Sequence, residues 1–561
     1  MRSSRILAAL TPLLIAACGS STTTTREAPA PRGATAAEIS AADLRNRISI
    51  FADDSMMGRR TGTPGNAKGN AYIVSELRRL GLRPAGDSGS FLQKVPLSSY
   101  AADSSRATLR SSSGELALWT DYYPYQAQFE VPARPINGSS LVYIGGPSDS
   151  TALPPREALQ GKLVVYNSSA SGNTLGAPDL SPSGRLGLIS GIVVTGVDTL
   201  IATFDQMFRT PRIVVKENLS IPPGLTQPRL IILPSASVQK LFGKSLDQLR
   251  PGETGPAIQG EVSFDESDLG ASNVVAVLEG SDPGRRAEYV ALGAHNDAIG
   301  VVPPVDHDSL RAYNAVMRPR GANDPPGEPE TEQAERIRAM VDSMRKLRPA
   351  RLDSIVNGAD DDGSGSMALL EIAEAAVRNP QRPKRSLLFV WHTGEESGLQ
   401  GSRWFTDNPT VPRDSIVAQI NTDMIGRGGP KDEATRDPAY LQVIGSRRLS
   451  TELGDLAETV NREGKFGLVF DYSYDADGHP DNFYCRSDHY MYARYGIPIS
   501  FFSTGGHRDY HQVTDELEYL DFDKYARVVK FVGAVMDRVA NLDHRLVVDK
   551  PKPDPEAPCQ Q

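Results

Sequence analysis

The sequence is short of cysteine, of excess positive charge and of long apolar runs. Of its 3 cysteines, one lies near the N-terminus, which leaves a single pair to consider for a disulfide. A net charge of −9 argues against a nucleic-acid partner, because nucleic-acid-binding proteins usually present a basic surface. Beyond the first 17 residues, no apolar stretch is long enough for a membrane-spanning helix. The composition, 39% hydrophobic and 23% charged, is that of an ordinary globular chain, and 561 residues suffice for two or three domains.

The N-terminus has the pattern of an export signal. Two arginines precede an apolar run from Ile6 to Ala17 that is too short to span a bilayer. The small residues before Cys18 resemble a bacterial lipoprotein cleavage box, so we expect removal of residues 1–17 and a lipid on Cys18; an ordinary secretory signal is the alternative. The Ser/Thr/Pro/Ala-rich residues 18–37 indicate a disordered tether. The mature protein is therefore expected to be exported, as a membrane-anchored lipoprotein on the periplasmic face or the cell surface.

The rest of the chain divides into segments of different composition. Residues 38–131 are predicted to form two helices joined by a Gly-rich loop, as the first part of the main domain. Residues 132–263 hold short β-rich runs such as SLVYIGG and KLVVYN, which indicates a separate β-rich domain. The Pro-rich residues 546–561 are expected to be a disordered tail. Because Cys559 lies in this tail, its pairing with Cys485 is left open, although an oxidising compartment would permit it.

From residue 264 to residue 545, strand-like and helix-like segments alternate. Apolar runs such as YVALGAH and SLLFVWH are interspersed with amphipathic stretches, among them residues 365–378 and 522–540. This pattern predicts an α/β fold: a mostly parallel, twisted sheet with helices on both faces. In such sheets, ligands bind at the carboxyl ends of the strands. Residues 301–356, polar and Pro-interrupted and then helical, are expected to be a surface excursion or lid, with His307 in a solvated loop.

Three consecutive carboxylates, Asp360, Asp361 and Asp362, occur within VNGADDDGSGSMALL. A solvated turn is one explanation, since Asp and Gly are ordinary turn residues. An EF-hand is excluded, because placing Gly363 sixth puts a glycine first and a leucine twelfth, where acidic ligands are needed. A cation held against the cluster is the third explanation, and it requires further ligands elsewhere in the chain.

Candidate ligands occur at the ends of the predicted strands. His295 ends YVALGAH, Glu396 ends LLFVWHTGEE and Asp423 lies near the end of VAQINTDMIG, while Asp361 precedes a helix and His511 follows the last core strand. Imidazole and carboxylate together suit zinc, and this set can hold two ions with one shared carboxylate. With the three carboxylates ionised, two Zn²⁺ leave a charge of about +1, which one hydroxide balances. We therefore predict two Zn²⁺ as cofactors.

Two further acidic residues are candidates for supporting roles. Asp297, two residues after His295, is placed to accept the second ring N–H and fix the tautomer, with loop capping as the plainer alternative. Glu395 and Glu396 are neighbours, and neighbours in an extended chain point in different directions. One of the two can therefore bind metal while the other acts as general base on a bound water.

These motifs resemble the dizinc exopeptidase family that contains bacterial leucyl-type aminopeptidases and glutamate carboxypeptidases. The matching segments, in the family's order over most of residues 288–516, are GAHND, GADDDGSGS, TGEESGLQGS, INTDMIG, SDHYMYARYGIPISFFS and DYHQVTDE. The resemblance implies that one carboxylate bridges two metals and that each ion has two further ligands. The bridge is Asp361, and the remaining pairs are His295 with Asp423 and Glu396 with His511.

The resemblance also implies roles for residues around the metals. Glu395 matches the general base, and Tyr510 matches a residue that hydrogen-bonds the developing oxyanion; a packed aromatic is the alternative for Tyr510. His489 and His507 fall within family motifs and could contact substrate. Residues 132–263 resemble an inserted protease-associated domain. One departure is the long insert between the first His motif and the Asp motif, which lie close together in many relatives.

The expected activity is that of an exported zinc-dependent exopeptidase, an aminopeptidase that removes N-terminal residues from peptides. A carboxypeptidase of the glutamate carboxypeptidase type is the main competing hypothesis, and it requires arginines that face a terminal carboxylate, with Arg427, Arg486 and Arg508 as candidates. The sequence is also compatible with a one-metal enzyme similar to glutaminyl cyclase and with a non-catalytic binding relative. Peptides are the expected partners, and no oligomeric state is predicted.

Overall fold

The computed structural model describes residues 35–125, 136–146, 153–168, 184–198, 201, 209–215, 228–428 and 437–561. The expected signal peptide, Cys18 and nearly all of the expected tether lie outside these residues. In the part of the chain that is described, no helix combines the length and apolar character needed to cross a bilayer.

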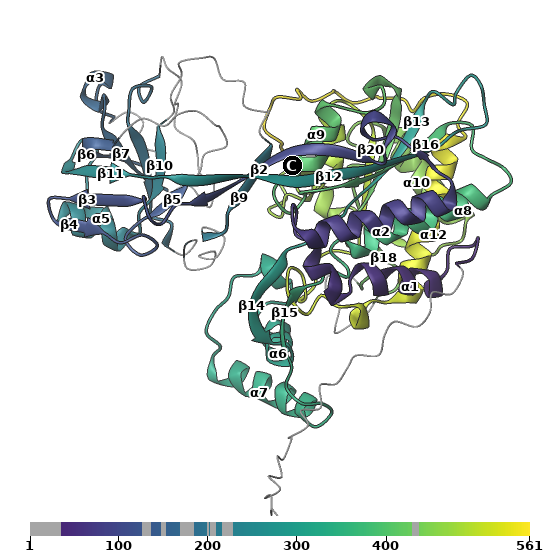
Figure 1. Cartoon of the computed structure of the whole chain (residues 1–561), viewed down its shortest axis with the longest axis horizontal. Coiled ribbons are helices and arrows are strands. Elements are labelled where there is room, and N and C mark those ends of the chain that lie inside the picture. The colour runs from purple at the N-terminus through teal and green to yellow at the C-terminus, as the bar shows by residue number, and fades with distance from the viewer. Residues whose placement is uncertain are drawn as a thin grey trace, which may run out of the picture. The chain divides into compact units, whose positions relative to one another are not determined.

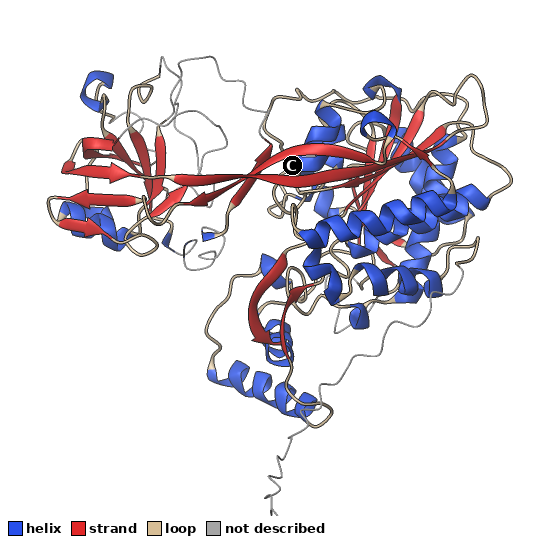
Figure 2. Ribbon diagram, in the orientation of Figure 1, coloured by secondary structure: helices blue, strands red, loops and turns tan. Residues whose placement is uncertain are grey.

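A ten-stranded sheet forms the main domain (Figures 1 and 2). Its order is β19-β18-β20-β17-β13-β16-β12-β2-β9, with β1 paired to β12. The four central strands run parallel: β13 (Tyr289–His295), β16 (Ser386–His392), β17 (Ile416–Thr422) and β20 (Ile499–Ser503). The outer strands are β1 (Arg83–Pro84), β2 (Leu92–Ala102), β9 (Arg212–Val215), β12 (Phe264–Leu278), β18 (Tyr440–Ile444) and β19 (Val469–Asp471). The α/β fold is confirmed, but the sheet is mixed, because β2, β9 and β12 pair antiparallel beside the parallel centre.

Helices cover both faces of this sheet because alternate strand residues point to opposite sides. Val274 and Ala276 pack into one apolar cluster, and their neighbours Val275 and Val277 pack into another. The first cluster is completed by α1 (Ala41–Phe51), α2 (Pro64–Leu80), α8 (Gly363–Arg378), α10 (Thr451–Glu463) and α12 (Phe522–Ala540). The second is completed by α9 (Gln400–Asp407) and α11 (His489–Ala493).

The predicted helices follow local signals in the sequence. Helix α2 begins after Thr63, whose hydroxyl accepts a hydrogen bond from the N–H of Asn66, and has Pro64 in its first turn. It ends at Gly81, where φ is 73°, a conformation that glycine adopts without steric cost. The helices predicted at residues 365–378 and 522–540 are α8 and α12.

A second sheet contains most of the β-rich residues. Its order is β4-β3-β11-β6-β7-β8-β10-β5. The strands are β3 (Thr108–Ser111), β4 (Gly114–Leu116), β5 (Tyr123–Tyr125), β6 (Ile136–Gly145), β7 (Leu163–Asn167), β8 (Gly191–Thr195), β10 (Arg229–Ile232) and β11 (Thr254–Glu261), with helices α3 (Arg156–Leu159) and α5 (Ser235–Phe242). The sheet therefore begins before residue 132, the boundary expected from the sequence. Strand β9, expected in the β-rich domain, instead pairs with β2 of the main sheet.

The insert at residues 301–356 is ordered and anchored. It contains the antiparallel pair β14 (Gly300–Asp306) and β15 (Leu352–Val356) and the helices α6 (His307–Met317) and α7 (Thr331–Arg345). Its contacts with the main domain include an ion pair of 3.2 Å between Arg320 and Asp481 and a backbone hydrogen bond of 3.1 Å from the N–H of Ala322 to the carbonyl of Tyr510. The insert is thus attached next to the loop that carries His511.

The C-terminal segment differs from the disordered tail expected from the sequence. Cys559 forms a disulfide with Cys485, with their Cα atoms 5.8 Å apart. The side chain of Gln561 accepts a hydrogen bond of 2.8 Å from the N–H of Tyr484 and donates one of 3.0 Å to the carbonyl of Tyr474. The proline content of residues 546–561 predicted disorder, but the disulfide and these side-chain contacts hold the segment in place.

Candidate functional site

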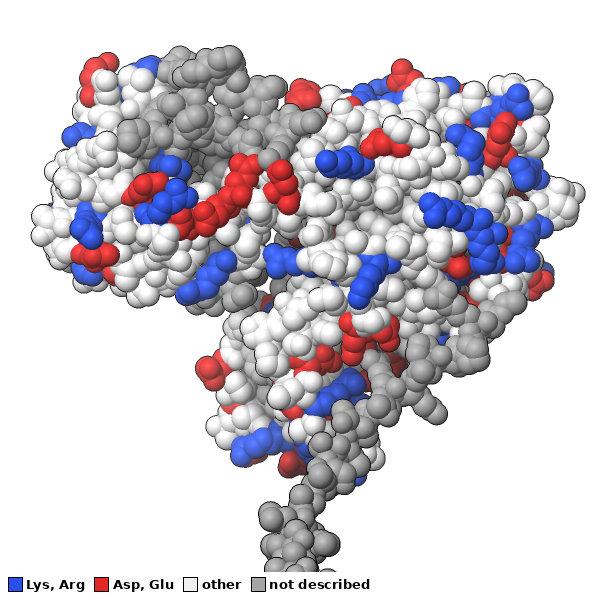
Figure 3. All heavy atoms as spheres, viewed as in Figure 1, with Lys and Arg blue, Asp and Glu red and all other residues white. Residues whose placement is uncertain are grey.

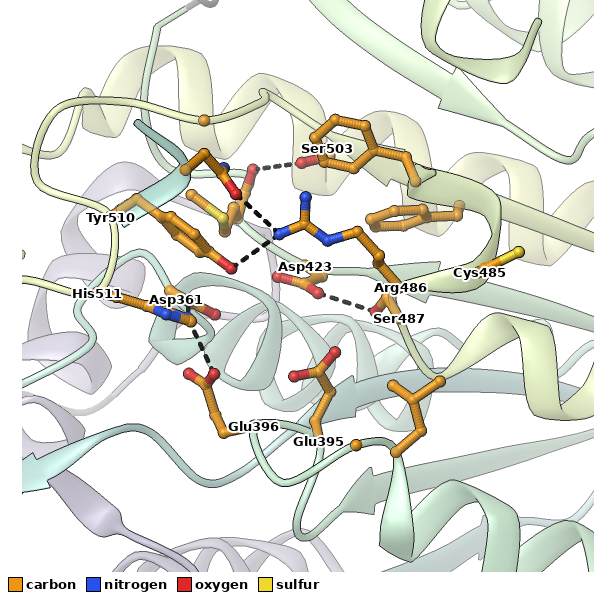
Figure 4. Close-up of a pocket in the computed structure, with 17 residues that line it drawn as sticks. Asp361, Glu395, Glu396, Asp423, Cys485, Arg486, Ser487, Ser503, Tyr510 and His511 are labelled. Carbon is orange, nitrogen blue, oxygen red and sulfur yellow. Dashed lines mark hydrogen bonds and ion pairs between the residues drawn. The ribbon is translucent and has the colours of Figure 1, made fainter. Parts of the chain in front are cut away.

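The five predicted metal ligands converge at the carboxyl edge of the central parallel strands. Figure 4 shows four of them: Asp361, Glu396, Asp423 and His511. His295 is the last residue of β13, Glu396 lies in the turn after β16, and Asp423 directly follows β17. Asp361 lies in the turn before α8, and His511 in the loop after β20. Parallel strands end at one edge of a sheet, which is why residues so far apart in the sequence meet here.

The ligands form two groups that share Asp361. In one group, Nε2 of His295 lies 3.0 Å from Oδ1 of Asp361 and 3.8 Å from Oδ1 of Asp423. In the other, Nε2 of His511 lies 3.0 Å from Oδ2 of Asp361 and 2.9 Å from Oε2 of Glu396. Asp361 therefore turns a different oxygen to each group, as a bridging carboxylate does.

The three adjacent aspartates have three different tasks. Asp360 turns back into the protein, where its Oδ1 accepts a hydrogen bond of 2.7 Å from the N–H of Gly426. Asp362 accepts hydrogen bonds from the N–H of Gly365, which caps α8, and from the N–H of His295. These two carboxylates hold the turn and neighbouring loops, and Asp361 between them, which is buried, faces the site.

The other ring nitrogen of His295 fixes its orientation through the main chain. Nδ1 lies 3.1 Å from the carbonyl oxygen of Asp297 and 3.7 Å from its carboxylate, so the carbonyl takes the role predicted for the side chain. The Asp297 carboxylate accepts hydrogen bonds of 2.6 Å from the hydroxyl of Thr61 and 3.2 Å from the N–H of Glu395. Asp297 therefore positions both His295 and the turn that carries Glu395.

Glu395 and Glu396 point in different directions, as predicted. Glu396 reaches His511, whereas the carboxylate of Glu395 points into the pocket (Figure 4). Burial, followed by the nearby Asp423 and Glu396, raises the pKa of Glu395 well above its usual value. A cation among these carboxylates would lower that pKa again.

Tyr510 lies over His511 with the ring centroids 3.9 Å apart. Its phenol oxygen accepts a hydrogen bond of 3.2 Å from Nη2 of Arg486, so its own proton is free to point elsewhere. Burial raises the pKa of Tyr510 to about 12, which keeps the phenol protonated at neutral pH. Nη2 of Arg486 also donates to Oδ1 of Asn323, a residue of the insert, over 3.1 Å.

A pocket of about 480 Å³ opens beside the ligands. Asp361, Glu395, Glu396, Asp423, Tyr510 and His511 contribute to its lining. Asn323, Cys485 and Ser487 also line it and were not predicted from the sequence. Ser487 is the first residue of the motif SDHYMYARYGIPISFFS and donates a hydrogen bond of 2.8 Å to Asp423, so the motif could have indicated it. Nothing in the sequence pointed to Asn323, because the insert has no counterpart in the motifs.

The structure places the remaining candidates behind the pocket rather than among its lining residues. His489 stacks on Phe501 at 4.5 Å in the second apolar cluster, and burial lowers its pKa to about 3. Nε2 of His507 lies 3.2 Å from Asp360, so His507 supports the aspartate turn. Neither residue lines the pocket described above, which does not support the predicted contact with substrate.

The residues present fit a pair of zinc ions. Nitrogen and oxygen ligands are the donors zinc accepts, and in each group the ligand atoms lie within 4.8 Å of one another. Oε1 of Glu396 is buried without a hydrogen-bond partner among the described residues, at a place where a cation would satisfy it. Three carboxylates this close are costly to bury unless a positive charge offsets them.

Comparison with known proteins agrees with this arrangement. Residues 273–536 match the model of a family described as Peptidase family M28. Leupeptin-inactivating enzyme 1 of Streptomyces exfoliatus is 31% identical over 164 residues, which cover 28% of this chain and 32% of that protein. Leucine aminopeptidase 1 of Trichophyton rubrum is 26% identical over 215 residues, which cover 36% of this chain and 54% of that protein. The chain thus spans about half or less of these relatives' length.

A solved structure, the aminopeptidase from Aneurinibacillus sp. strain AM-1, has the same fold. Its TM-score is 0.52 at 15% identity, over 92% of this chain and 97% of that chain. The shared fold is an α/β protein with a central parallel sheet, and in this chain two histidine–carboxylate groups lie at the carboxyl edge of that sheet. Residues 273–536 are thus similar to Peptidase family M28, in agreement with the resemblance found in the sequence.

Proposed function

We propose that this protein is a zinc-dependent aminopeptidase that hydrolyses the N-terminal bond of peptides with two metal ions. The observation that carries this proposal is the carboxylate of Asp361, which is shared between two ligand groups beneath the pocket. The names of the two relatives and of the solved structure support the activity.

His295 and Asp423 would hold one ion and Glu396 and His511 the other, with Asp361 between them. When bound, the ions supply Lewis acidity, which acidifies a water molecule and polarises the scissile carbonyl.

Glu395 accepts the proton of the attacking water and returns it to the leaving amine. Tyr510 donates its free phenol proton to the developing oxyanion, while Arg486 and the stacked His511 hold the ring in place.

Carboxypeptidase action is less well supported. It requires several arginines at the substrate, but Arg427 is buried and ion-paired with Asp509 at 2.9 Å. Of the three candidate arginines, only Arg486 lines the pocket. The four carboxylates in the lining, by contrast, suit the α-ammonium group of an aminopeptidase substrate.

The ligand set disfavours both a cyclase and a binding protein. A cyclase-like enzyme with one metal has no need of the second group around Glu396 and His511. A binding protein without catalysis needs neither the intact set nor the free carboxylate of Glu395 beside it.

Hydrolysis of leucine p-nitroanilide, with and without a chelator, tests the proposal. We expect turnover that a chelator abolishes and zinc restores. In Glu395→Gln, the rate should fall on the order of a hundredfold to ten-thousandfold while the metal content is retained. Near-native turnover by this variant would show that Glu395 is not the base, and cleavage of an N-acetylated peptide would argue against aminopeptidase action.

The cellular location is part of the same proposal. The export pattern at the N-terminus supports a lipid on Cys18 and attachment to the periplasmic face or the cell surface. Labelling with a radioactive fatty acid, compared between the wild type and Cys18→Ser, tests the anchor. Loss of membrane association without loss of activity is the expected result for Cys18→Ser.

Peptides rather than nucleic acids are the proposed partners. On the face drawn in Figure 3, basic and acidic side chains are interspersed over the described residues, in keeping with the acidic net charge. We further propose that the second sheet is the protease-associated domain expected from the sequence and that it shapes substrate access. A deletion of this domain should change the preference for peptide length more than the hydrolysis of leucine p-nitroanilide.

A further inference from the structure

Three of the four fully buried arginines among the described residues are ion-paired, whereas the fourth, Arg59, donates only to main-chain carbonyls. Arg47 is ion-paired with Glu371 and Glu374, Arg385 with Glu288, and Arg427 with Asp509. Arg486 lines the pocket, yet its contacts in the described part of the chain are to neutral oxygens rather than to a carboxylate. Arg486 is partly buried, and although burial lowers its pKa, the nearby Tyr510 and Glu395 raise it overall. A ligand carboxylate would add a direct ion pair to a guanidinium that has none among the described residues.

The guanidinium of Arg486 is held in a defined orientation, and some of its N–H donors have no acceptor among the described residues. Nη2 uses its two protons on Oδ1 of Asn323 and the phenol oxygen of Tyr510 (Figure 4). Nη1 makes one long contact of 3.4 Å with the carbonyl of Asp481. An arginine has five N–H donors, so Nε and the second proton of Nη1 are available for the paired hydrogen bonds that carboxylates accept.

We propose that Arg486, oriented by Asn323 of the insert, binds a carboxylate of the substrate and makes this site selective for peptides that carry one next to the scissile bond. This inference rests on the proposed aminopeptidase function. Nη2 lies 3.2 Å from the phenol oxygen of Tyr510, the proposed donor to the oxyanion. The carboxylate would therefore belong to one of the two residues that flank the scissile bond.

Two sources supply a carboxylate at that distance. One is the acidic side chain of an N-terminal Glu or Asp, and the other is the free α-carboxylate of a dipeptide. Both use the same guanidinium chemistry.

Paired substrates that differ only in this charge test the proposal. One pair is Glu- and Gln-p-nitroanilide, and the other is the dipeptide Leu-Gly and its amide Leu-Gly-NH₂. In the wild type, the ratio of kcat/KM within at least one pair should favour the carboxylate on the order of tenfold to hundredfold. The pair that shows it identifies the source.

Substitutions at Arg486 and Asn323 test whether these residues cause the preference for a carboxylate. Arg486→Gln should abolish the preference, Arg486→Lys should restore part of it, and Asn323→Ala should reduce it several-fold. Arg338→Gln is the matched control, because Arg338 is an exposed arginine on α7 of the same insert and does not line the pocket. This control should keep the wild-type ratio.

The outcomes separate this inference from the proposed function. Chelator-sensitive cleavage of leucine p-nitroanilide with equal rates within both pairs, or a preference that survives in Arg486→Gln, would overturn the carboxylate subsite alone. If the wild type cleaves no substrate, the proposed function fails. The subsite is then decided by calorimetry on Glu395→Gln, where Leu-Gly should bind more tightly than its amide and lose that advantage in Glu395→Gln/Arg486→Gln.

Discussion

The imidazoles of His295 and His511 each place Nε2 3.0 Å from a different oxygen of Asp361. The two histidines come from different strand ends, and the carboxylate between them is buried in the turn before α8. Such sharing gives Asp361 a part in both groups, while every other ligand belongs to one. Loss of Asp361 should therefore differ from loss of any other ligand.

Replacing Asp361 with asparagine should remove both ions, because the amide cannot bridge them with two anionic oxygens. His511→Gln should remove one ion and leave the group of His295 occupied. Metal content measured by mass spectrometry, about zero and about one per chain, distinguishes the variants. Asp477 is an exposed aspartate that belongs to neither ligand group, so Asp477→Asn should keep both metal ions. Equal losses in the two ligand variants would contradict a bridging role.

Removing the hydroxyl of Tyr510 should lower kcat more than it changes KM. Tyr510→Phe keeps the stacking on His511 but loses the proposed donor to the oxyanion, so we expect a fall of roughly a hundredfold to a thousandfold in kcat. Steady-state kinetics on leucine p-nitroanilide gives both constants. A change in KM alone would mean that the phenol contacts the ground state and not the transition state.

The disulfide should stabilise the pocket as well as the tail. Cys559→Ser frees the C-terminal segment from Cys485, and we expect a loss of about 2–4 kcal/mol in the free energy of unfolding. Because Cys485 lines the pocket next to Arg486, catalytic efficiency should also fall. Urea unfolding and kinetics of the same preparation check both effects. Unchanged stability would show that the tail contributes nothing to the fold.

Glu516 should make stability depend on pH. Burial raises its pKa to about 8, whereas an unfolded glutamate titrates near 4.5. The folded state prefers the neutral acid, so its contribution is full below pH 4.5 and is lost as the pH rises to about 8. Glutamine is neutral throughout and can still accept the hydrogen bond from Asn357. Glu516→Gln should therefore gain stability over the wild type, on the order of a few kcal/mol above pH 8.

Unfolding free energies at pH 4.5 and 8.5 measure this difference. Glu518→Gln is the control, because Glu518 is partly exposed, and despite burial its hydrogen bond with Tyr519 and its ion pair with Arg351 lower its pKa. That variant should show no gain at high pH. A difference between Glu516→Gln and the wild type that stays constant with pH would contradict a raised pKa.

The main domain could be predicted from the sequence because its signals are local. Apolar runs of 5 to 7 residues predicted the central strands, and apolar residues at helical spacing predicted α2. The five ligands could be placed at one edge because parallel strands end together. Their positions in the structure agree with the predicted grouping, although their metal-binding roles stay a prediction.

The parts that were not predicted depend on contacts between distant segments. The antiparallel pairing of β2 with β12 and β9 joins residues more than a hundred positions apart, and no periodicity reveals it. The same holds for the disulfide of Cys485 and for Asn323, which reaches the pocket only because the insert is anchored on the main domain. His307, expected in a solvated loop, is instead buried beside Asp308 and Tyr519.

Metal stoichiometry against activity tests the central claim most directly. Chelated protein titrated with zinc should be inactive at first and should reach full hydrolysis of leucine p-nitroanilide at two ions per chain. Full activity at one ion per chain, or in protein shown by elemental analysis to contain no metal, would contradict the account.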